Sequence, residues 1–497
     1  MSIRDITLSI WRALSGDVSY FWNRFITKLS LVHRRWIPYL VVLAAFMIVL
    51  YEGKRIAAGV GVAVLGEILL VVFVVFALVR SVWAIGILVC LRVMPDVHVA
   101  SLPGLNVMTL AVLTLAFAAF VRLALRKGYF PNVPLWIPMV CTYAMFWVSA
   151  FYYGDSWKAP QQQVVKDLIG MATGPIVYFY VITSDLKKKD VMNIVRWLFL
   201  VWFITAAHVL LLGIIGYLEG GGTEEFAAYV HRNDTIDDYY PATLIVALSY
   251  VLATIRVAPI ELNIRRWQLS TLLLGGVAAI LMSSFMSAIV GLLVALTVTL
   301  YLTRSKKTKQ RASSVAVVLF VAILVSPLFI PALSVVEDKL YYRVAFEGGS
   351  VIALGPLTQR LSIWWPVAWD EFLKQPLFGL GWNRSWRLLN GPFNLVLHCL
   401  SLFGLIGTGV IVWFLMTLLR YLRQCSHYFE DKAFWSTLAI GTFAGLVGNI
   451  AFFMAEDGFF GSWFMVFYLL AALLAKGRYD FSSSAVQLGW NSRWTSS

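Results

Sequence analysis

The run that decides the fold is NLVLHCLSLFGLIGTGVIVWFLMTLL, residues 394–419. It is almost entirely apolar and contains no Asp, Glu, Lys or Arg. A helix rises about 1.5 Å per residue, so about 20 such residues cross the roughly 30 Å hydrocarbon core of a bilayer. This run therefore predicts a transmembrane helix.

Similar runs recur along the 497 residues, of which 60% are hydrophobic and only 13% charged. Long soluble chains do not have this composition, so the sequence predicts an all-α, polytopic integral membrane protein with about 12–14 transmembrane helices. The count is a range because the third run is short and the pair around Ser283–Met286 is barely separated. The predicted runs are 36–52, 58–79, 82–94, 104–121, 134–152, 167–183, 192–217, 241–258, 268–284, 286–303, 313–332, 394–419, 434–454 and 458–475.

The basic residues indicate the orientation of these helices. The net charge is +14, from 40 Lys+Arg against 26 Asp+Glu, and the basic segments between the runs all fall on one side of this topology. Cytoplasmic loops are enriched in Lys and Arg, so that side is predicted to be the cytoplasm, with both termini on it. This placement explains the charge without a nucleic-acid partner, since no basic groove with interleaved aromatic residues is evident.

This topology divides the chain into five parts. Residues 1–35 form a cytoplasmic N-terminal segment, and residues 36–332 form transmembrane helices with an outward loop at 219–240. A second outward loop, 333–393, is followed by C-terminal transmembrane helices at 394–475 and a cytoplasmic tail at 476–497. Loops as long as 333–393 are usually functional, so we expect the site there.

The long outward loop contains a predicted amphipathic helix. Apolar residues at 361, 364, 365, 368, 369 and 372 have helical spacing. Ser362 is a candidate N-cap, Pro366 falls in the first turn, and Asp370 and Lys374 form a candidate i,i+4 pair. The three tryptophans at 364, 365 and 369 suit the headgroup level of a membrane. The helix is predicted to end in a turn at QPLFGLGWN, residues 375–383.

A series of short motifs in this region resembles the O-antigen ligase and O-antigen polymerase superfamily of integral membrane glycosyltransferases. The series is Arg360, a tryptophan four or five residues later, the run PLFGLG, then Asn394 and the run GLIG at Gly404–Gly407. Two positions differ from the superfamily pattern. Phe393 stands where a histidine is expected, and Met286, in MSSFMSAIVGLL, stands where an arginine is often found.

The resemblance implies transfer of a saccharide from undecaprenyl pyrophosphate to a sugar hydroxyl, at the periplasmic face of a bacterial inner membrane. The outward loops would then be periplasmic. The reaction implied needs no nucleotide, metal or other cofactor. Its partners would be the lipid-linked oligosaccharide, a glycan acceptor and membrane lipid, with a chain-length regulator and a flippase as possible protein partners, and no nucleic acid.

The residues expected to carry the chemistry follow from these demands. Arginine binds two phosphate oxygens at once, which favours Arg360 at the pyrophosphate. Arg232 resembles the arginine in the superfamily's other outward loop, which implies the same role for it. His398 lies one helical turn beyond Asn394, on the same face, and is the candidate base in place of the missing histidine. The expected catalytic residues are therefore His398, Arg360 and Arg232; the expected substrate-binding residues are Arg343, Arg384, Arg387, Asn394, Trp364 and His231; no metal ligands are expected.

Several functions stay open on the sequence alone. We favour an O-antigen or exopolysaccharide repeat-unit polymerase, because the changes at Phe393 and Met286 argue against a close copy of the ligase that transfers glycan to lipid A core. A flippase or other transporter would suit the helix count, although the two halves show no internal symmetry. A non-catalytic scaffold of an assembly complex is the third alternative.

Two polar residues inside predicted membrane segments have no assigned step. They are Glu67 and His208, and ionisable groups inside a membrane are usually functional. The four cysteines, Cys90, Cys141, Cys399 and Cys425, have neither disulfide nor metal-ligand spacing.

Overall fold

The computed structural model describes residues 70, 73–74, 76–78, 80–91, 107–124, 135–151, 161–219, 239–254, 262–282, 286–302, 364–381, 394–454 and 464–487. Every regular element in these ranges is a helix, which confirms the all-α prediction. Three of the helices are long and apolar enough to cross a membrane: Lys188–Leu212, Leu395–Tyr428 and Ala433–Phe453. Seven shorter apolar helices accompany them, and the number of spans stays a prediction. The predicted runs at 36–52 and 313–332 lie outside the described residues.

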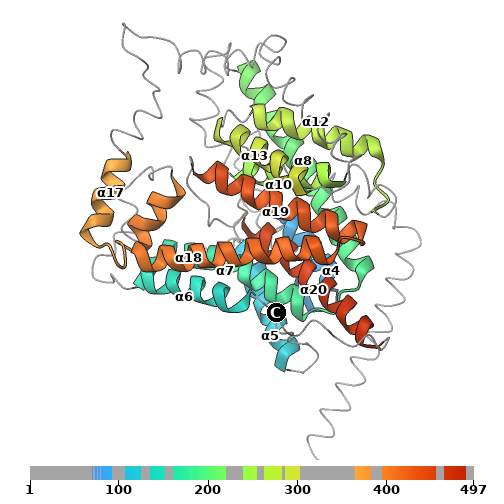
Figure 1. Ribbon diagram of the computed structural model, residues 1–497, viewed down its shortest axis with the longest axis horizontal. Helices are drawn as coiled ribbons and strands as arrows, with labels where there is room; N and C mark the ends of the chain where they lie inside the picture. The colour runs from blue at the N-terminus through green and yellow to red at the C-terminus, as the bar shows by residue number, and fades with distance from the viewer. Residues whose placement is uncertain are drawn as a thin grey trace, which may run out of the picture. The chain divides into compact units, whose positions relative to one another are not determined.

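Figure 1 shows the helices in their order along the chain. They are α4 (Ser81–Leu91), α5 (Val107–Ala124), α6 (Trp136–Phe151), α7 (Gln161–Thr183), α8 (Lys188–Glu219), α10 (Tyr239–Thr254), α12 (Arg266–Met282), α13 (Met286–Leu302), α17 (Trp365–Lys374), α18 (Leu395–Tyr428), α19 (Ala433–Phe453) and α20 (Met465–Gln487). Helix α8 ends at Glu219 and α10 begins at Tyr239, and residues 220–238, predicted as part of the first outward loop, lie outside the described residues.

Two helices run further than the apolar runs from which they were predicted. Helix α18 continues past residue 419 to Tyr428, and α20 continues past residue 475 to Gln487. Residues 419 and 475 mark where hydrophobicity falls, and the ends of the membrane spans stay a prediction. Lys and Arg are good helix formers, and their long side chains can reach water from the end of a span.

Glycines allow the closest helix contacts of the bundle, where α19 packs on α10 and α13. A Cβ built on Gly448 of α19 would lie 2.6 Å from the carbonyl oxygen of Gly291 in α13, and one on Gly291 would lie 2.7 Å from the carbonyl oxygen of Gly448. Helices in membranes associate through such small residues. Asn449 is fully buried beside this contact, and its side-chain amide donates to the carbonyl oxygen of Ala242 in α10 at 3.1 Å.

Basic residues near the helix ends hold several helices together. The Arg122 guanidinium, in the last turn of α5, donates to Ser184 Oγ at 2.6 Å, to the carbonyl oxygen of Ala77 at 2.7 Å and to Ser81 Oγ at 2.9 Å. It also lies 4.6 Å from the ring centre of Tyr180. Four segments therefore meet at this guanidinium: the end of α5, the end of α7, the start of α4 and the residues before α4.

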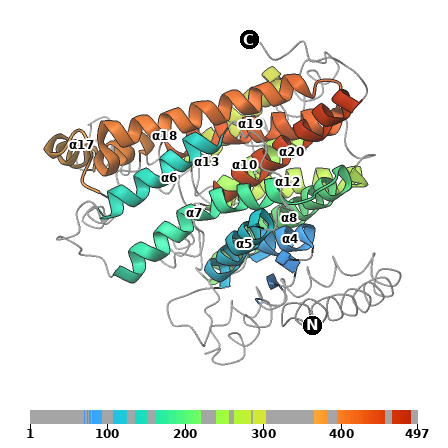
Figure 2. The same ribbon diagram turned by 90° about the horizontal axis from the view of Figure 1, so that it is seen from below.

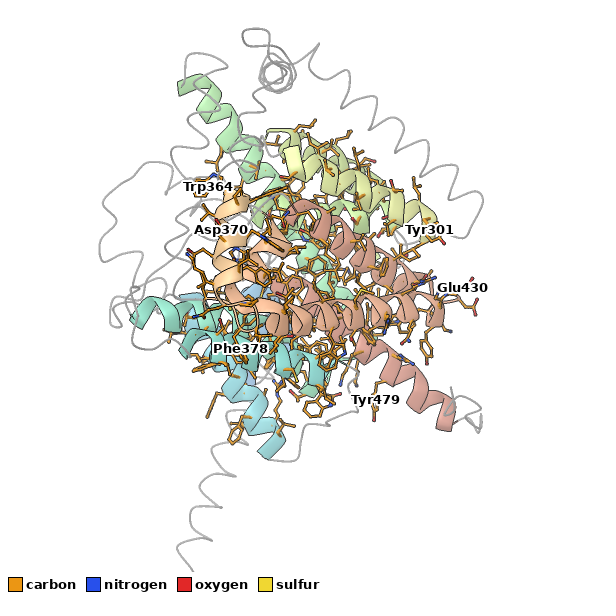
Figure 3. The ribbon with its side chains drawn as sticks, turned by 60° about the vertical axis from the view of Figure 1, so that its left-hand side comes forward. Tyr301, Trp364, Asp370, Phe378, Glu430 and Tyr479 are labelled. Atoms are coloured by element: carbon orange, nitrogen blue, oxygen red, sulfur yellow. The ribbon has the colours of Figure 1, made fainter. Side chains whose placement is uncertain are left out.

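The middle of α20 joins the same region. Lys476 Nζ donates to the carbonyl oxygen of Ile182 in α7 at 3.5 Å, and the Arg478 guanidinium lies 5.3 Å from the ring centre of Tyr428, the last residue of α18. Figure 3 shows Glu430, which follows α18, well separated from Trp364 at the start of α17. The ends of α5, α7 and α18 and the middle of α20 are thus gathered together, at a distance from α17.

Candidate functional site

The described part of the candidate site centres on α17 and the start of α18. Figure 1 shows α17 at one end of α18 and directed across it, and the two helices are in contact. Ala368 and Phe372 of α17 are buried, while Trp369 is 46% exposed. The predicted helix is therefore present, but its apolar residues lie both on the face that packs against the protein and on its exposed side.

One predicted detail of α17 was wrong, and another lies outside the described residues. Pro366 lies in the first turn, and Trp364, at the N-cap position, makes no side-chain cap; the candidate cap Ser362 lies outside the described residues. Lys374 pairs with Glu371 at 2.6 Å instead of with Asp370. Spacings of three and four both bring side chains together on a helix, so sequence spacing alone does not choose between these two acids.

Helix α18 is broken at Gly404. This residue has φ 61° and ψ −165°, a conformation that only glycine adopts readily. The break divides α18 into a short segment, Leu395–Phe403, and a long helix, Leu405–Tyr428. A break leaves amide and carbonyl groups without their helical partners, and such groups are costly in a membrane.

The PLFGLG run that follows α17 supplies the missing partners. Leu405 N donates to Pro376 O at 2.8 Å, and Ile406 N donates to Leu377 O at 3.1 Å. In an unbroken helix these two amides would bond the carbonyls of Ser401 and Leu402, four residues earlier.

The carbonyls of the broken helix are satisfied in the same way. Ser401 O accepts from Leu380 N at 2.8 Å, and Leu402 O accepts from Gly381 N at 3.0 Å. We call residues 376–381 and 401–406, joined by these four bonds, the glycine clasp. Each half contains the tetrapeptide Leu-Phe-Gly-Leu, at 377–380 and 402–405. The hydrogen bonds follow the same repeat, because residues that are 25 positions apart in the two halves make equivalent bonds. The clasp therefore has a local pseudo-twofold arrangement.

The two central glycines are required by close backbone contact. A Cβ on Gly404 would lie 2.4 Å from the carbonyl carbon of Leu377, and a Cβ on Gly379 would lie 2.4 Å from that of Leu402. Gly379 also has a positive φ of 69°. Both contacts are to main-chain atoms, so no side chain can rotate to relieve them.

Asn394 caps the short segment of α18. Its Oδ1 accepts from Val396 N at 3.0 Å and Leu397 N at 3.1 Å, and its Nδ2 donates to Met454 O, beyond the end of α19, at 3.2 Å. The side chain is 9% exposed. These contacts show a structural role, and substrate binding by Asn394 stays a prediction.

We expect Asn394→Ala to destabilise the protein by about 0.5–2 kcal/mol, the usual cost of losing an N-cap. Asn394→Asp should lose less, because a carboxylate still accepts from Val396 and Leu397 although it cannot donate to Met454. Thermal unfolding of the purified variants in detergent measures both effects. Equal stability of Asn394→Ala and the parent would contradict the capping role.

His398 lies one turn into the short segment. Its backbone amide donates to Asn394 O at 2.9 Å, its carbonyl accepts from Ser401 Oγ at 3.1 Å, and its side chain is half-buried. Three of the predicted site residues are thus described, with Trp364 on α17 and Asn394 and His398 on the segment that the clasp joins to α17. The others lie outside the described residues: Arg360, Arg232, Arg343, Arg384, Arg387 and His231.

The two intramembrane polar residues have different outcomes. Glu67 lies outside the described residues. The His208 ring lies 5.4 Å from the ring of Tyr240, at the start of α10, and its Nδ1 is buried without a hydrogen-bond partner in the described part of the chain. In that same part no three His, Cys, Asp or Glu side chains gather as metal ligands do, and the four cysteines are free.

Sequence reasoning missed the clasp, although one signal was present. The repeated Leu-Phe-Gly-Leu tetrapeptide is visible in the sequence, and two equal segments with a central glycine are able to pair symmetrically. Comparison with known proteins adds no further guide, since no family model and no curated protein matches this chain.

Proposed function

We propose that this protein is a metal-independent glycosyltransferase that polymerises oligosaccharide repeat units carried on undecaprenyl pyrophosphate, for O-antigen or exopolysaccharide synthesis. The observation that supports it most is the glycine clasp. The runs PLFGLG and GLIG, on which the resemblance rests, meet in one backbone structure beside the segment that carries Asn394 and His398.

The proposed reaction is a single displacement. The acceptor hydroxyl oxygen bonds to the anomeric carbon of the donor sugar, and the bond from that carbon to the pyrophosphate breaks. His398 takes the hydroxyl proton, and Arg360 and Arg232 bind the pyrophosphate as negative charge develops on it. Undecaprenyl pyrophosphate is the leaving group, and in this proposal Trp364 contacts donor sugar or lipid.

Loss of the gene tests this function in cells. The deletion strain should accumulate single lipid-linked repeat units and lack long polysaccharide, and expression of the chain should restore the polymer. Loss of attachment to lipid A core with polymer still present would indicate the ligase instead. Failure of repeat units to reach the periplasm would indicate a flippase.

Arg360 provides a sharper test of the phosphate-binding step. Arg360→Ala should lose polymer, and Arg360→Lys should fail to restore it, because lysine keeps the charge but cannot bind two phosphate oxygens with a planar fork. Polymer is measured by gel, with protein amount followed by immunoblot and Lys374→Ala on the exposed side of α17 as a control. Full activity of Arg360→Ala would limit this residue to anchoring at the interface.

The proposed orientation makes a separate prediction. A reporter fused after Lys309 should be cytoplasmic and one inserted near Gly348 should be periplasmic, because the segment 304–311 contains five Lys and Arg. Paired alkaline phosphatase and fluorescent protein fusions measure this directly. Opposite signals at the two sites would place the long loop in the cytoplasm and remove the proposed site from the donor.

A further inference from the structure

Helix α17 and the turn after it expose an unusual amount of apolar side chain. We call this set the α17 apolar surface, and its exposed fractions are Val367 39%, Trp369 46%, Leu373 55% and Leu377 56%. Four large exposed apolar side chains within eleven residues are costly in water. The surface therefore needs a partner.

The α17 apolar surface is continuous with the exposed side of the long helix of α18. Leu405, Val412 and Met416 are 53%, 51% and 45% exposed, and their spacings of seven and four place them on one helix face. The clasp bond from Ile406 N to Leu377 O joins the two surfaces directly. An exposed apolar face along a helix that is long enough to span a membrane contacts acyl chains, and the α17 apolar surface extends that face.

Helix length gives the depth of the clasp. The first charged residue after Gly404 is Arg420, sixteen residues later, which corresponds to about 24 Å of helix. Helix α6 gives a second measure of this depth, because its Phe146 ring lies 5.2 Å from the Phe403 ring, next to the clasp. Helix α6 begins at Trp136, ten residues before Phe146, which corresponds to about 15 Å of helix. Figure 2 shows α6 and α18 side by side. Both distances are shorter than the roughly 30 Å hydrocarbon core.

We propose that the glycine clasp and the α17 apolar surface are embedded in the hydrocarbon of one leaflet, with the acyl chains of the bilayer as the partner of this surface. Irregular backbone is tolerated at such a depth only when its polar groups are satisfied, and the four clasp bonds do this for both halves. The charged side of α17, with Asp370 and the Glu371–Lys374 pair, then lies toward the headgroups.

This depth has a consequence that rests on the proposed function. His398 is six residues before Gly404, so it lies at most about 9 Å further along the short segment. Added to the roughly 24 Å of helix between Gly404 and Arg420, this upper limit reaches the outer edge of the hydrocarbon. The pyrophosphate of a lipid-linked donor lies at that level, while its isoprenoid chain lies alongside the α17 apolar surface.

Spin labelling tests the embedding without using activity. Cys141→Ala removes the exposed thiol, and Cys90, Cys399 and Cys425 are buried. A nitroxide is attached to Leu377→Cys or Leu373→Cys in this full-length background, and the protein is reconstituted in phospholipid vesicles. Relaxation of the label is measured with oxygen, which concentrates in hydrocarbon, and with a water-soluble nickel chelate. Val412→Cys, on the exposed side of α18, is the matched reference, and the background chain itself must carry no label.

Embedding predicts several-fold stronger relaxation by oxygen than by the nickel chelate at both α17 positions, as at Val412. Stronger relaxation by the nickel chelate would show that the surface lies in water and overturn the proposal. Weak relaxation by both would show that protein covers the surface, which also overturns it. None of these outcomes depends on glycosyl transfer, so an inactive protein with embedded labels would refute only the proposed function.

Discussion

Replacing Gly404 with alanine is expected to remove most of the folded, active protein. The new Cβ would meet the backbone of Leu377 at 2.4 Å, and the required φ of 61° disfavours any side chain. Backbone strain and overpacking together predict a loss of roughly 2–5 kcal/mol. Gly379→Ala should behave alike, because its Cβ would meet the backbone of Leu402 at the same distance.

The matched control for these variants lies on the same helix. A Cβ on Gly409 of α18 has nothing within 4 Å, so Gly409→Ala should be neutral or stabilise the helix by about 0.5–1 kcal/mol. Detergent-solubilised fluorescent fusions, compared by size-exclusion profile and by melting temperature, measure all three variants. If Gly404→Ala and Gly409→Ala gave the same profile and melting temperature, the clasp geometry described here would be wrong.

The second large effect is expected at His398. His398→Ala should lower the rate of transfer by about 10²–10⁴-fold, the usual contribution of a general base, with the protein still folded. His398→Gln keeps the size and the hydrogen bonding but not the proton transfer, so it should be almost as inactive. His427→Gln, at the other end of α18, is the matched control and should retain full activity.

The measurement is the rate of polymer formation by purified variants, with melting temperature as the control for folding. Normal activity of His398→Gln would assign this residue to packing or hydrogen bonding. The base would then be His231, an acid of the predicted outward loop such as Asp237 or Asp238, or no side chain at all. All three named residues lie outside the described residues.

The sequence predicted the helices well and the site less completely. Apolar runs located α8, α10 and α19 to within a few residues, because hydrophobic length is the main determinant of a membrane helix. The break in α18 had no such signal. In the local sequence Gly404, Gly407 and Gly409 look equivalent. The repeated Leu-Phe-Gly-Leu tetrapeptide distinguishes Gly404, but the contact that accompanies the break is with a distant turn.

Asn394 illustrates the same difference between local and distant information. An asparagine directly before an apolar run is a typical helix N-cap, so its bonds to Val396 and Leu397 were predictable from local sequence. Its bond to Met454 joins residues sixty positions apart, and no local pattern indicates it. The arginines expected at the pyrophosphate, Arg360 and Arg232, lie outside the described residues.

The central claim is that this chain itself joins lipid-linked repeat units. The most direct test incubates the purified full-length protein in lipid vesicles with a fluorescent repeat unit on undecaprenyl pyrophosphate, without nucleotide sugar, and separates the products by gel. We predict a ladder of products that each differ by one repeat unit, and its loss in Arg360→Ala and His398→Ala. A donor that stays a single unit, under conditions in which the protein remains folded and moves the donor across the vesicle membrane, would contradict the claim and identify a transporter.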